Sequence, residues 1–238
     1  MVKYSICITN YNARYTLRQC LESVLYQIDS DFEVVVSDNY STDGSREILE
    51  EYARNGKINL IIEHSNRGRG RQIAFENSKG DYIISGIDTD DVIKPVLKDV
   101  LRLYHEKHEG YMLSYGTIHI IPRYLVIAIG GWRDLQWGED VDFAFRIESM
   151  GKIHYFPDVA RVVGKKGSLK RGFLSRVRYR YLYYQCRYKI GLSVLDDLKA
   201  AYWYTRPIEL LIAIFALAVI KLKRVPRFEY KSDDRARE

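Results

Sequence analysis

The chain has 238 residues, of which 47% are hydrophobic, and it carries a formal net charge of +6. This length and composition fit a folded protein with one sizeable core and an appendage. Three cysteines, Cys7, Cys20 and Cys186, are too few and too scattered for a disulfide framework or a zinc site, and their odd number fits a reducing compartment.

The positive charge is concentrated in one stretch. Between Arg161 and Gly191 the chain has ten Lys or Arg residues and no Asp or Glu, so the rest of the protein is slightly acidic. A basic block of this kind indicates a phosphate-rich partner, which can be an anionic lipid, a nucleotide or a nucleic acid.

The first 95 residues alternate between strand-like and helix-like segments. Apolar runs predict strands at 2–9, 32–36, 58–63 and 81–87, and helical spacing predicts helices at 15–27, 46–55 and 67–77. Ser41 or Asp43 is the expected N-cap of the second helix. Strands that alternate with helices predict an α/β fold, with a mainly parallel sheet and helices on both faces.

After Pro95 the pattern is looser. We expect a helix at 96–107, a strand at the edge of the core at 112–121, a turn at 130–132, a helix at 140–150 and a strand at 153–163. A basic, aromatic helix at 173–190 and an apolar segment at 208–220 follow. The chain begins directly on a strand-like segment, and no signal peptide is predicted.

Carboxylates follow the apolar runs at three places. Asp38 follows the second strand, the cluster from Asp88 to Asp91 follows the fourth, and Glu139 and Asp140 begin a helix. Open α/β sheets bind ligands at the carboxyl ends of their strands. Asp38 is placed to accept a hydrogen bond from a nucleotide base, and the Asp88–Asp91 cluster supplies oxygen ligands for Mg²⁺ or Mn²⁺. The alternative for the cluster is a solvated acidic loop.

Glu139 and Asp140 are candidates for a general base that takes a proton from a hydroxyl group. Their alternative role is to stabilise the helix N-terminus by about 0.3–1 kcal/mol, and both roles are compatible. Arg71 lies early in its helix, where it can approach a base or a phosphate oxygen, or be an ordinary surface arginine.

Several segments, taken in order, resemble the inverting GT-A glycosyltransferases of glycosyltransferase family 2. The first is Thr-Asn-Tyr-Asn after the opening strand, and the second is Asp-Asn-Tyr-Ser-Thr-Asp-Gly-Ser after the next strand. Asp-Thr-Asp-Asp resembles the family's Asp-x-Asp metal motif. Gly-Gly-Trp and Gly-Glu-Asp-Val-Asp-Phe resemble its acceptor-side segments. The resemblance covers residues 2–165.

The resemblance implies a role for each matching residue. Thr9, Tyr11, Asp38 and Arg71 would contact the nucleotide, Asp88 would lie near the ribose and the metal, and Asp90 would ligate the metal. Asp140, with Glu139 beside it, would be the catalytic carboxylate. The cofactor would be Mg²⁺ or Mn²⁺, and the donor a nucleotide-diphosphate sugar.

The same resemblance implies a domain plan. Residues 1–167 would form the GT-A catalytic domain, with a nucleotide-sugar half at 1–95 and an acceptor half at 96–167. Residues 168–238 would form the helical extension. In two places the chain departs from the family pattern: Asn39 stands where a second Asp is usual, and no His follows Val163. A nucleotidyltransferase and a non-catalytic nucleotide- or glycan-binding module are the alternative functions.

The C-terminal extension has features of a membrane interface. Aromatic residues at 202–204 precede the apolar segment at 208–220, and Lys221, Lys223 and Arg224 follow it. Thirteen residues are fewer than the roughly 20 that a spanning helix needs, so we expect an interfacial or short hydrophobic anchor. The expected partners are an anionic membrane surface and a glycan or lipid-linked acceptor, without nucleic acid. The expected location is the cytoplasmic side of the cell membrane.

Overall fold

A computed structural model describes residues 2–115, 118–156, 214–215, 218–219 and 222. The chain divides into two units, Met1–Ser168 and Leu169–Glu238. The sheet and the helices that flank it belong to the first unit.

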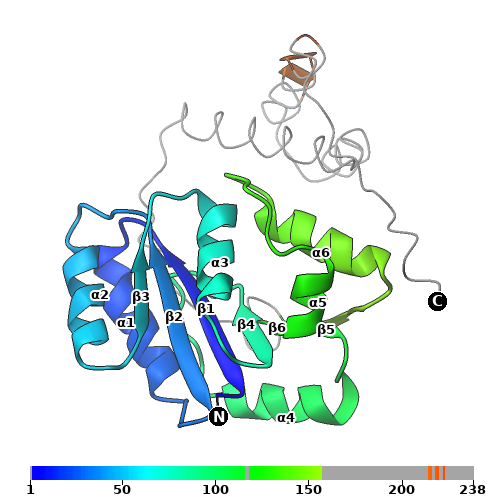
Figure 1. Ribbon diagram of the computed structural model, residues 1–238, viewed down its shortest axis with the longest axis horizontal. Helices are drawn as coiled ribbons and strands as arrows, with labels where there is room; N and C mark the ends of the chain where they lie inside the picture. Colours follow the sequence, from blue (N-terminus) through cyan, green and yellow to red (C-terminus); the bar gives the residue numbers. More distant parts are fainter. Residues whose placement is uncertain (1, 116–117, 157–213, 216–217, 220–221, 223–238) are drawn as a thin grey trace. The chain divides into compact units, whose positions relative to one another are not determined.

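The described part of this unit is built on a seven-stranded sheet with the order β3-β2-β1-β4-β6-β5-β7 (Figure 1). Neighbouring strands are parallel except where β6 pairs antiparallel with β4 and β5. The bounds of the strands are β1 Tyr4–Asn10, β2 Phe32–Asp38, β3 Asn59–Ile62, β4 Tyr82–Ser85, β5 Met112–Tyr115, β6 Ile118–Pro122 and β7 Ile153–Phe156. The predicted α/β class, with a mainly parallel mixed sheet, is confirmed.

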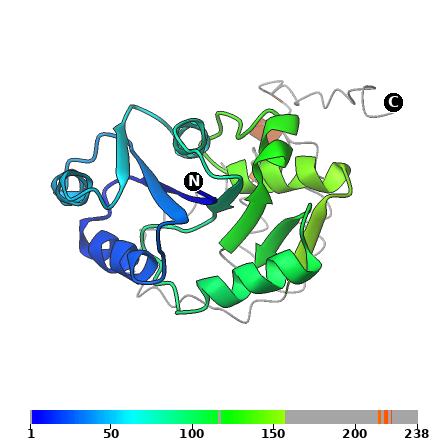
Figure 2. The same cartoon turned by 60° about the horizontal axis from the view of Figure 1, so that its bottom comes forward.

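Helices cover both faces of the sheet (Figure 2). Helices α1, α2 and α4 bury one core, whose sheet residues include Ile6, Ile8 and Val36. Helices α3, α5 and α6 bury a second core on the opposite face, with Cys7 and Val35. The bounds of the helices are α1 Arg14–Leu25, α2 Ser45–Arg54, α3 Arg67–Glu76, α4 Leu97–Lys107, α5 Arg123–Ala128 and α6 Glu139–Ser149.

The second half of the sheet corrects one prediction. The segment at 112–121, expected to be a single edge strand, forms two antiparallel strands, and Tyr115 pairs with Ile118. The second of these, β6, lies inside the sheet between β4 and β5. Only Gly116 and Thr117 separate the two strands in the sequence, and this short interruption is the turn signal that the prediction missed. Helix α5, which follows β6 directly, was also not predicted.

The N-cap of α2 is neither of the two predicted residues, Ser41 and Asp43. Gly44 is the N-cap, in a left-handed conformation with φ of 96°. The carboxylate of Asp43 accepts hydrogen bonds from the backbone N–H and the hydroxyl of Ser45. Asp43 therefore stabilises the first turn, whereas Ser41 turns toward Asp38.

Several C-terminal predictions lie outside the described residues. These are the strand beyond residue 156, the helix at 173–190 and most of the apolar segment at 208–220. Within the described part of the chain, every helix is too short or too polar to span a lipid bilayer.

Candidate functional site

The loops after β1 and β2 are held together by Asp38, which is completely buried. Its carboxylate accepts hydrogen bonds from Nδ2 of Asn10 (2.7 Å) and from the hydroxyl (2.6 Å) and backbone N–H (2.9 Å) of Ser41. Three internal donors leave little acceptor capacity for a base N–H, so the predicted base contact remains a prediction. Tyr11, in the loop after β1, is exposed over 62% of its surface and is available to a ligand.

The aspartate cluster forms a tight turn beside the end of β1. Asp88 forms an isolated parallel bridge with Thr9, and the N–H of Asp91 donates to the carbonyl of Asp88 at 2.9 Å. The Asp91 carboxylate in turn accepts from the N–H of Asp88 at 3.2 Å. Asp91 therefore stabilises the turn, while the side chain of Asp88 is 61% exposed and Asp90 is partly exposed.

Arg71 joins three of the predicted site residues. Its Nε donates to Oε1 of Glu139 (3.4 Å), and its Nη2 donates to Oδ2 of Asp140 (2.9 Å) and lies 3.7 Å from Oδ1 of Asp88. Its guanidinium is buried, so these charge interactions are screened less than they would be at the surface. Nη1 is buried and has no hydrogen-bond partner among the described residues, so its two N–H groups are unpaired.

Glu139 and Asp140 are distinguished by their exposure. The side chain of Glu139 is 4% exposed and that of Asp140 is 39% exposed. Burial raises the pKa of Glu139, the neighbouring Asp140 carboxylate raises it further, and Arg71 opposes both. Asp140 is thus the more accessible of the two carboxylates, and Glu139 pairs with Arg71 from the buried side.

The loop between α5 and α6 packs on the start of α3. The N–H of Gly68 donates to the carbonyl of Leu135 at 2.9 Å, Asn66 bonds to Asp134, and Arg67 lies 4.4 Å from the ring centre of Trp137. A Cβ atom on Gly68 would overlap the carbonyl oxygen of Arg133, so this approach requires glycine. We call these contacts, together with the bond from the Trp132 N–H to Gln72, the α3 latch.

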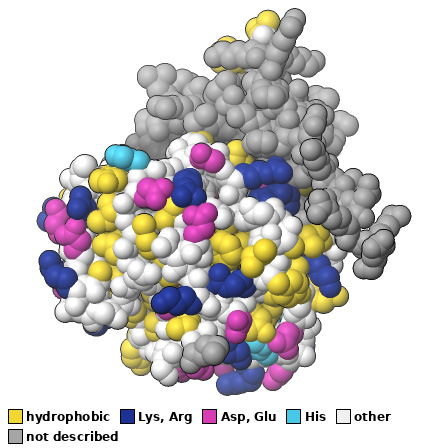
Figure 3. Space-filling model, viewed as in Figure 1, with side chains coloured by type: hydrophobic (Ala, Val, Ile, Leu, Met, Phe, Trp, Pro, Cys, Tyr) yellow, Lys and Arg dark blue, Asp and Glu magenta, His cyan; other side chains and the backbone are white. Residues whose placement is uncertain are grey.

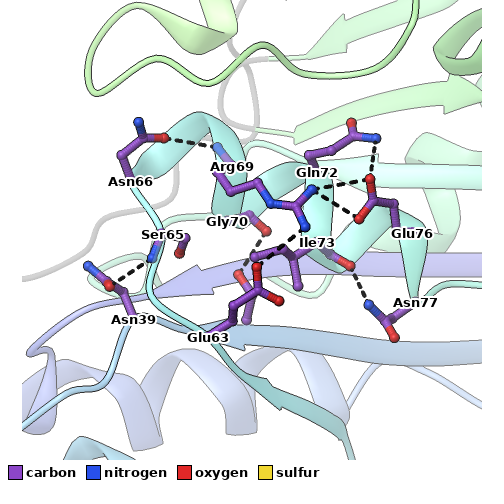
Figure 4. A network of polar contacts seen from close by, with 11 residues as sticks. Asn39, Glu63, Ser65, Asn66, Arg69, Gly70, Gln72, Ile73, Glu76 and Asn77 are labelled. Carbon is purple, nitrogen blue, oxygen red and sulfur yellow. Dashed lines mark hydrogen bonds and ion pairs between the residues drawn. The ribbon is translucent and has the colours of Figure 1, made fainter.

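Helix α3 is also tied to β2, where the hydroxyl of Ser37 donates to the carbonyl of Gly70, and to the end of β3, where Arg69 pairs with Glu63 (Figure 4). Asn66 accepts from the N–H of Arg69 and caps the helix, and Oδ1 of Asn39 accepts from the N–H of Ser65 at 3.0 Å. Asn39 is the residue that departs from the family pattern, and here it holds the loop after β3 in place.

The residues predicted to bind a divalent metal suit such an ion. Asp88 and Asp90 are hard oxygen donors, and Mg²⁺ is commonly held by one or two carboxylates with waters and substrate phosphates. Among the described residues there is no group of three or more His, Cys, Asp or Glu side chains that could hold a metal. Two carboxylates are what proteins commonly contribute to a Mg²⁺ site, where water and phosphate oxygens complete the shell.

One residue of this region was not predicted. His119 on β6 pairs with Ser85 across the sheet. Burial lowers the pKa of its ring, Asp140 raises it, and Arg71 lowers it. A single His in a run of isoleucines was the signal in the sequence.

Charged side chains elsewhere on the described surface are mixed. Figure 3 shows acidic and basic side chains interspersed over one face, without a broad patch of either sign among the described residues.

Comparisons with known proteins identify the family and the fold of the chain. Residues 5–123 match the family model for Glycosyl transferase family 2. The chain is 33% identical over 121 residues to the poly(ribitol-phosphate) beta-N-acetylglucosaminyltransferase TarS of Staphylococcus aureus, covering 48% of this chain and 21% of that protein. It is 31% identical over 130 residues to the putative teichuronic acid biosynthesis glycosyltransferase TuaG of Bacillus subtilis, covering 53% and 48%. The chain thus spans between about a fifth and a half of these relatives.

Solved structures share the fold. TarS residues 1–349 in complex with UDP superpose with a TM-score of 0.59 at 19% identity, covering 83% of this chain and 69% of that one. A mannosyltransferase from Pyrobaculum calidifontis, in complex with GDP-Man and Mn²⁺, gives a TM-score of 0.63 at 19% identity, covering 92% and 75%.

Proposed function

The chain belongs to glycosyl transferase family 2, and on that premise we propose that it moves a sugar from a nucleotide-diphosphate sugar to a hydroxyl group of a glycan or lipid-linked acceptor. The observation that supports this most is the convergence of Asp88, Glu139 and Asp140 on Arg71. These residues come from both the predicted donor half and the predicted acceptor half, so the two predicted halves meet at Arg71. Family membership disfavours the nucleotidyltransferase alternative.

The proposed reaction is a single in-line displacement with inversion. The acceptor hydroxyl gives its proton to Asp140 while its oxygen forms the new bond to the anomeric carbon. The bond between that carbon and the diphosphate oxygen breaks, and its electron pair leaves with the nucleotide diphosphate. Arg71 keeps Asp140 in place, and its free Nη1 can donate to an oxygen of the donor.

Thr9 and Tyr11 are proposed to line the nucleotide site, at the carboxyl ends of β1 and β2, and the buried Asp38 is proposed to hold the loops of that site in place. Asp88 and Asp90 would hold Mg²⁺ or Mn²⁺, which when bound neutralises charge on the leaving diphosphate. The Pyrobaculum calidifontis mannosyltransferase, which shares the fold, is in complex with Mn²⁺ as well as GDP-Man, and this supports the choice of ion.

Replacing Asp90 by asparagine should abolish UDP binding that depends on a divalent cation, because an amide is a poorer ligand than a carboxylate for a hard cation. Titration calorimetry with UDP, in Mn²⁺ and in EDTA, measures this. Asp81→Asn, at the opposite end of β4, is the matched control and should bind UDP as the wild type does. Full activity of the Asp90 variant in EDTA would refute the proposed site.

We also propose that the protein works on an anionic membrane surface, because ten cations lie between Arg161 and Gly191 without an acidic residue. Each cation close to such a surface contributes about 1 kcal/mol. The full chain should therefore sediment with phosphatidylserine vesicles at low salt, and not with phosphatidylcholine vesicles. Failure to sediment with the anionic vesicles would contradict this proposal and would point to a soluble acceptor.

A panel of UDP-GlcNAc, UDP-glucose and GDP-mannose tests the main proposal. We expect Mn²⁺-dependent release of the nucleoside diphosphate from at least one of them. If UDP and GDP bind but no donor is ever cleaved, the chain is the non-catalytic binding module instead.

A further inference from the structure

His119 lies on the same face of the sheet as α3, α5 and α6. Its neighbours Ile118 and Ile120 belong to the core under α1, α2 and α4, and Ile121 belongs to the opposite core. Because side chains alternate along a strand, His119 shares the face of Ile121. Helices α3 and α6, which carry Arg71 and Asp140, cover this same face.

On this face the sheet changes from apolar to polar toward the site. Along β1 Cys7 is followed by Thr9, and along β4 Ile83 is followed by Ser85, each two residues nearer the carboxyl end. Strand β6 runs the other way, so His119 is nearer the site than Ile121, and it pairs with Ser85. His119 is therefore at the polar end of the sheet, where the predicted substrate site lies.

The two ring nitrogens of His119 have different surroundings. Nδ1 is buried and has no hydrogen-bond partner among the described residues, whereas Nε2 is not among the buried unpartnered atoms and is bonded to none of the described residues, so Nε2 is the accessible nitrogen. Burial lowers the pKa of His119, Asp140 opposes this, and the Arg71 cation lowers it further. The neutral ring has one N–H, and an orphaned buried N–H is rarer in proteins than an under-satisfied acceptor. The proton accordingly belongs on Nε2.

We propose that His119 is a positioning residue whose Nε2–H holds the oxygen of the attacking hydroxyl group, or of water in donor hydrolysis, beside Asp140. This inference rests on the proposed function. A hydroxyl oxygen has two lone pairs: one would accept from His119 while the other attacks the anomeric carbon, and the hydroxyl proton passes to Asp140. Fixing the oxygen in this way lowers the entropy cost of reaching the transition state.

The test is hydrolysis of UDP-GlcNAc, UDP-glucose and GDP-mannose by the full chain with Mn²⁺, where water is the acceptor. His119→Leu should lower kcat about tenfold, the scale of one hydrogen bond, and leave the Kd for UDP unchanged. His119→Gln, whose amide nitrogen can stand near the Nε2 position, should retain most of kcat. His119→Asn, which reaches only the Nδ1 position, should behave like His119→Leu.

A purely structural role and the proposed positioning role predict different effects of His119→Leu on Tm and on UDP binding. The unpartnered Nδ1 costs stability, so His119→Leu should keep or raise Tm. A lower Tm with a parallel loss of UDP binding would overturn the inference, as would rescue by Asn but not by Gln. His105→Gln on α4, whose ring bonds to Tyr4 at the far end of the sheet, is the control and should leave kcat unchanged. If the wild type is active and His119→Leu keeps full kcat, this inference alone fails; if the wild type cleaves no donor, the proposed function fails first.

Discussion

Replacing Asp140 by asparagine should lower kcat by about a hundredfold or more, the scale of losing a general base. The asparagine Oδ1 can still accept from Arg71, which Asp140 contacts at 2.9 Å, so the geometry of the site should persist. An amide cannot take the proton of the acceptor, and this alone accounts for the expected loss. Steady-state hydrolysis of the donor, together with UDP titration, measures the two effects separately.

The structure supplies a control for this prediction. Glu139→Gln removes a carboxylate of the same pair that is only 4% exposed and that an acceptor cannot reach. Its effect on kcat should be much smaller than that of Asp140→Asn. A collapse of UDP affinity in Asp140→Asn, with kcat preserved at saturation, would instead make Asp140 a ligand of the donor.

Replacing Arg71 by methionine should destabilise the fold by about 3–5 kcal/mol, because it leaves Glu139 as a buried carboxylate without its cation. Urea denaturation measures the loss. Arg69→Met on the same helix is the matched control: its ion pairs with Glu63 and Glu76 are exposed, so the expected loss is below about 1 kcal/mol.

The loss in Arg71→Met should depend on pH. Burial raises the pKa of Glu139 already, and removing Arg71 raises it further, so the folded state holds a proton that the unfolded state releases. Stability then falls as pH rises from the ordinary carboxyl range through the raised pKa. The deficit should be smaller at about pH 5 than at about pH 8, and adding Glu139→Gln should remove most of it. A deficit that is independent of pH and of Glu139 would show that lost packing is the cause.

The first half of the fold could be predicted because strand and helix alternate with clear hydrophobic periods and end in carboxylates. The second half was predicted less well, since only Gly116 and Thr117 separate β5 from β6 in the sequence, and two residues are easily missed as a turn. The grouping of Asp88, Glu139 and Asp140 was expected only as a likeness to a family. Arg71 joins these residues because of how α3 and α6 pack, and the sequence alone does not show that packing.

The roles of individual residues could likewise be predicted from the sequence only in part. Sequence spacing identified Asp38 as a functional candidate, but it could not show that three internal donors already occupy its carboxylate. The single His among isoleucines marked His119 in the sequence, but the face of the sheet on which it lies could be assigned only when the neighbouring strands were known.

The α3 latch limits how this enzyme can be recombined with its relatives. A chimaera that joins residues 1–95 of this chain to the acceptor half of another transferase would keep Gly68 and Gln72 but lose the loop that they hold. The foreign loop must offer a carbonyl to the Gly68 N–H and a backbone N–H to Gln72. The two proposed halves can therefore be exchanged only when both sides of this contact are transplanted together.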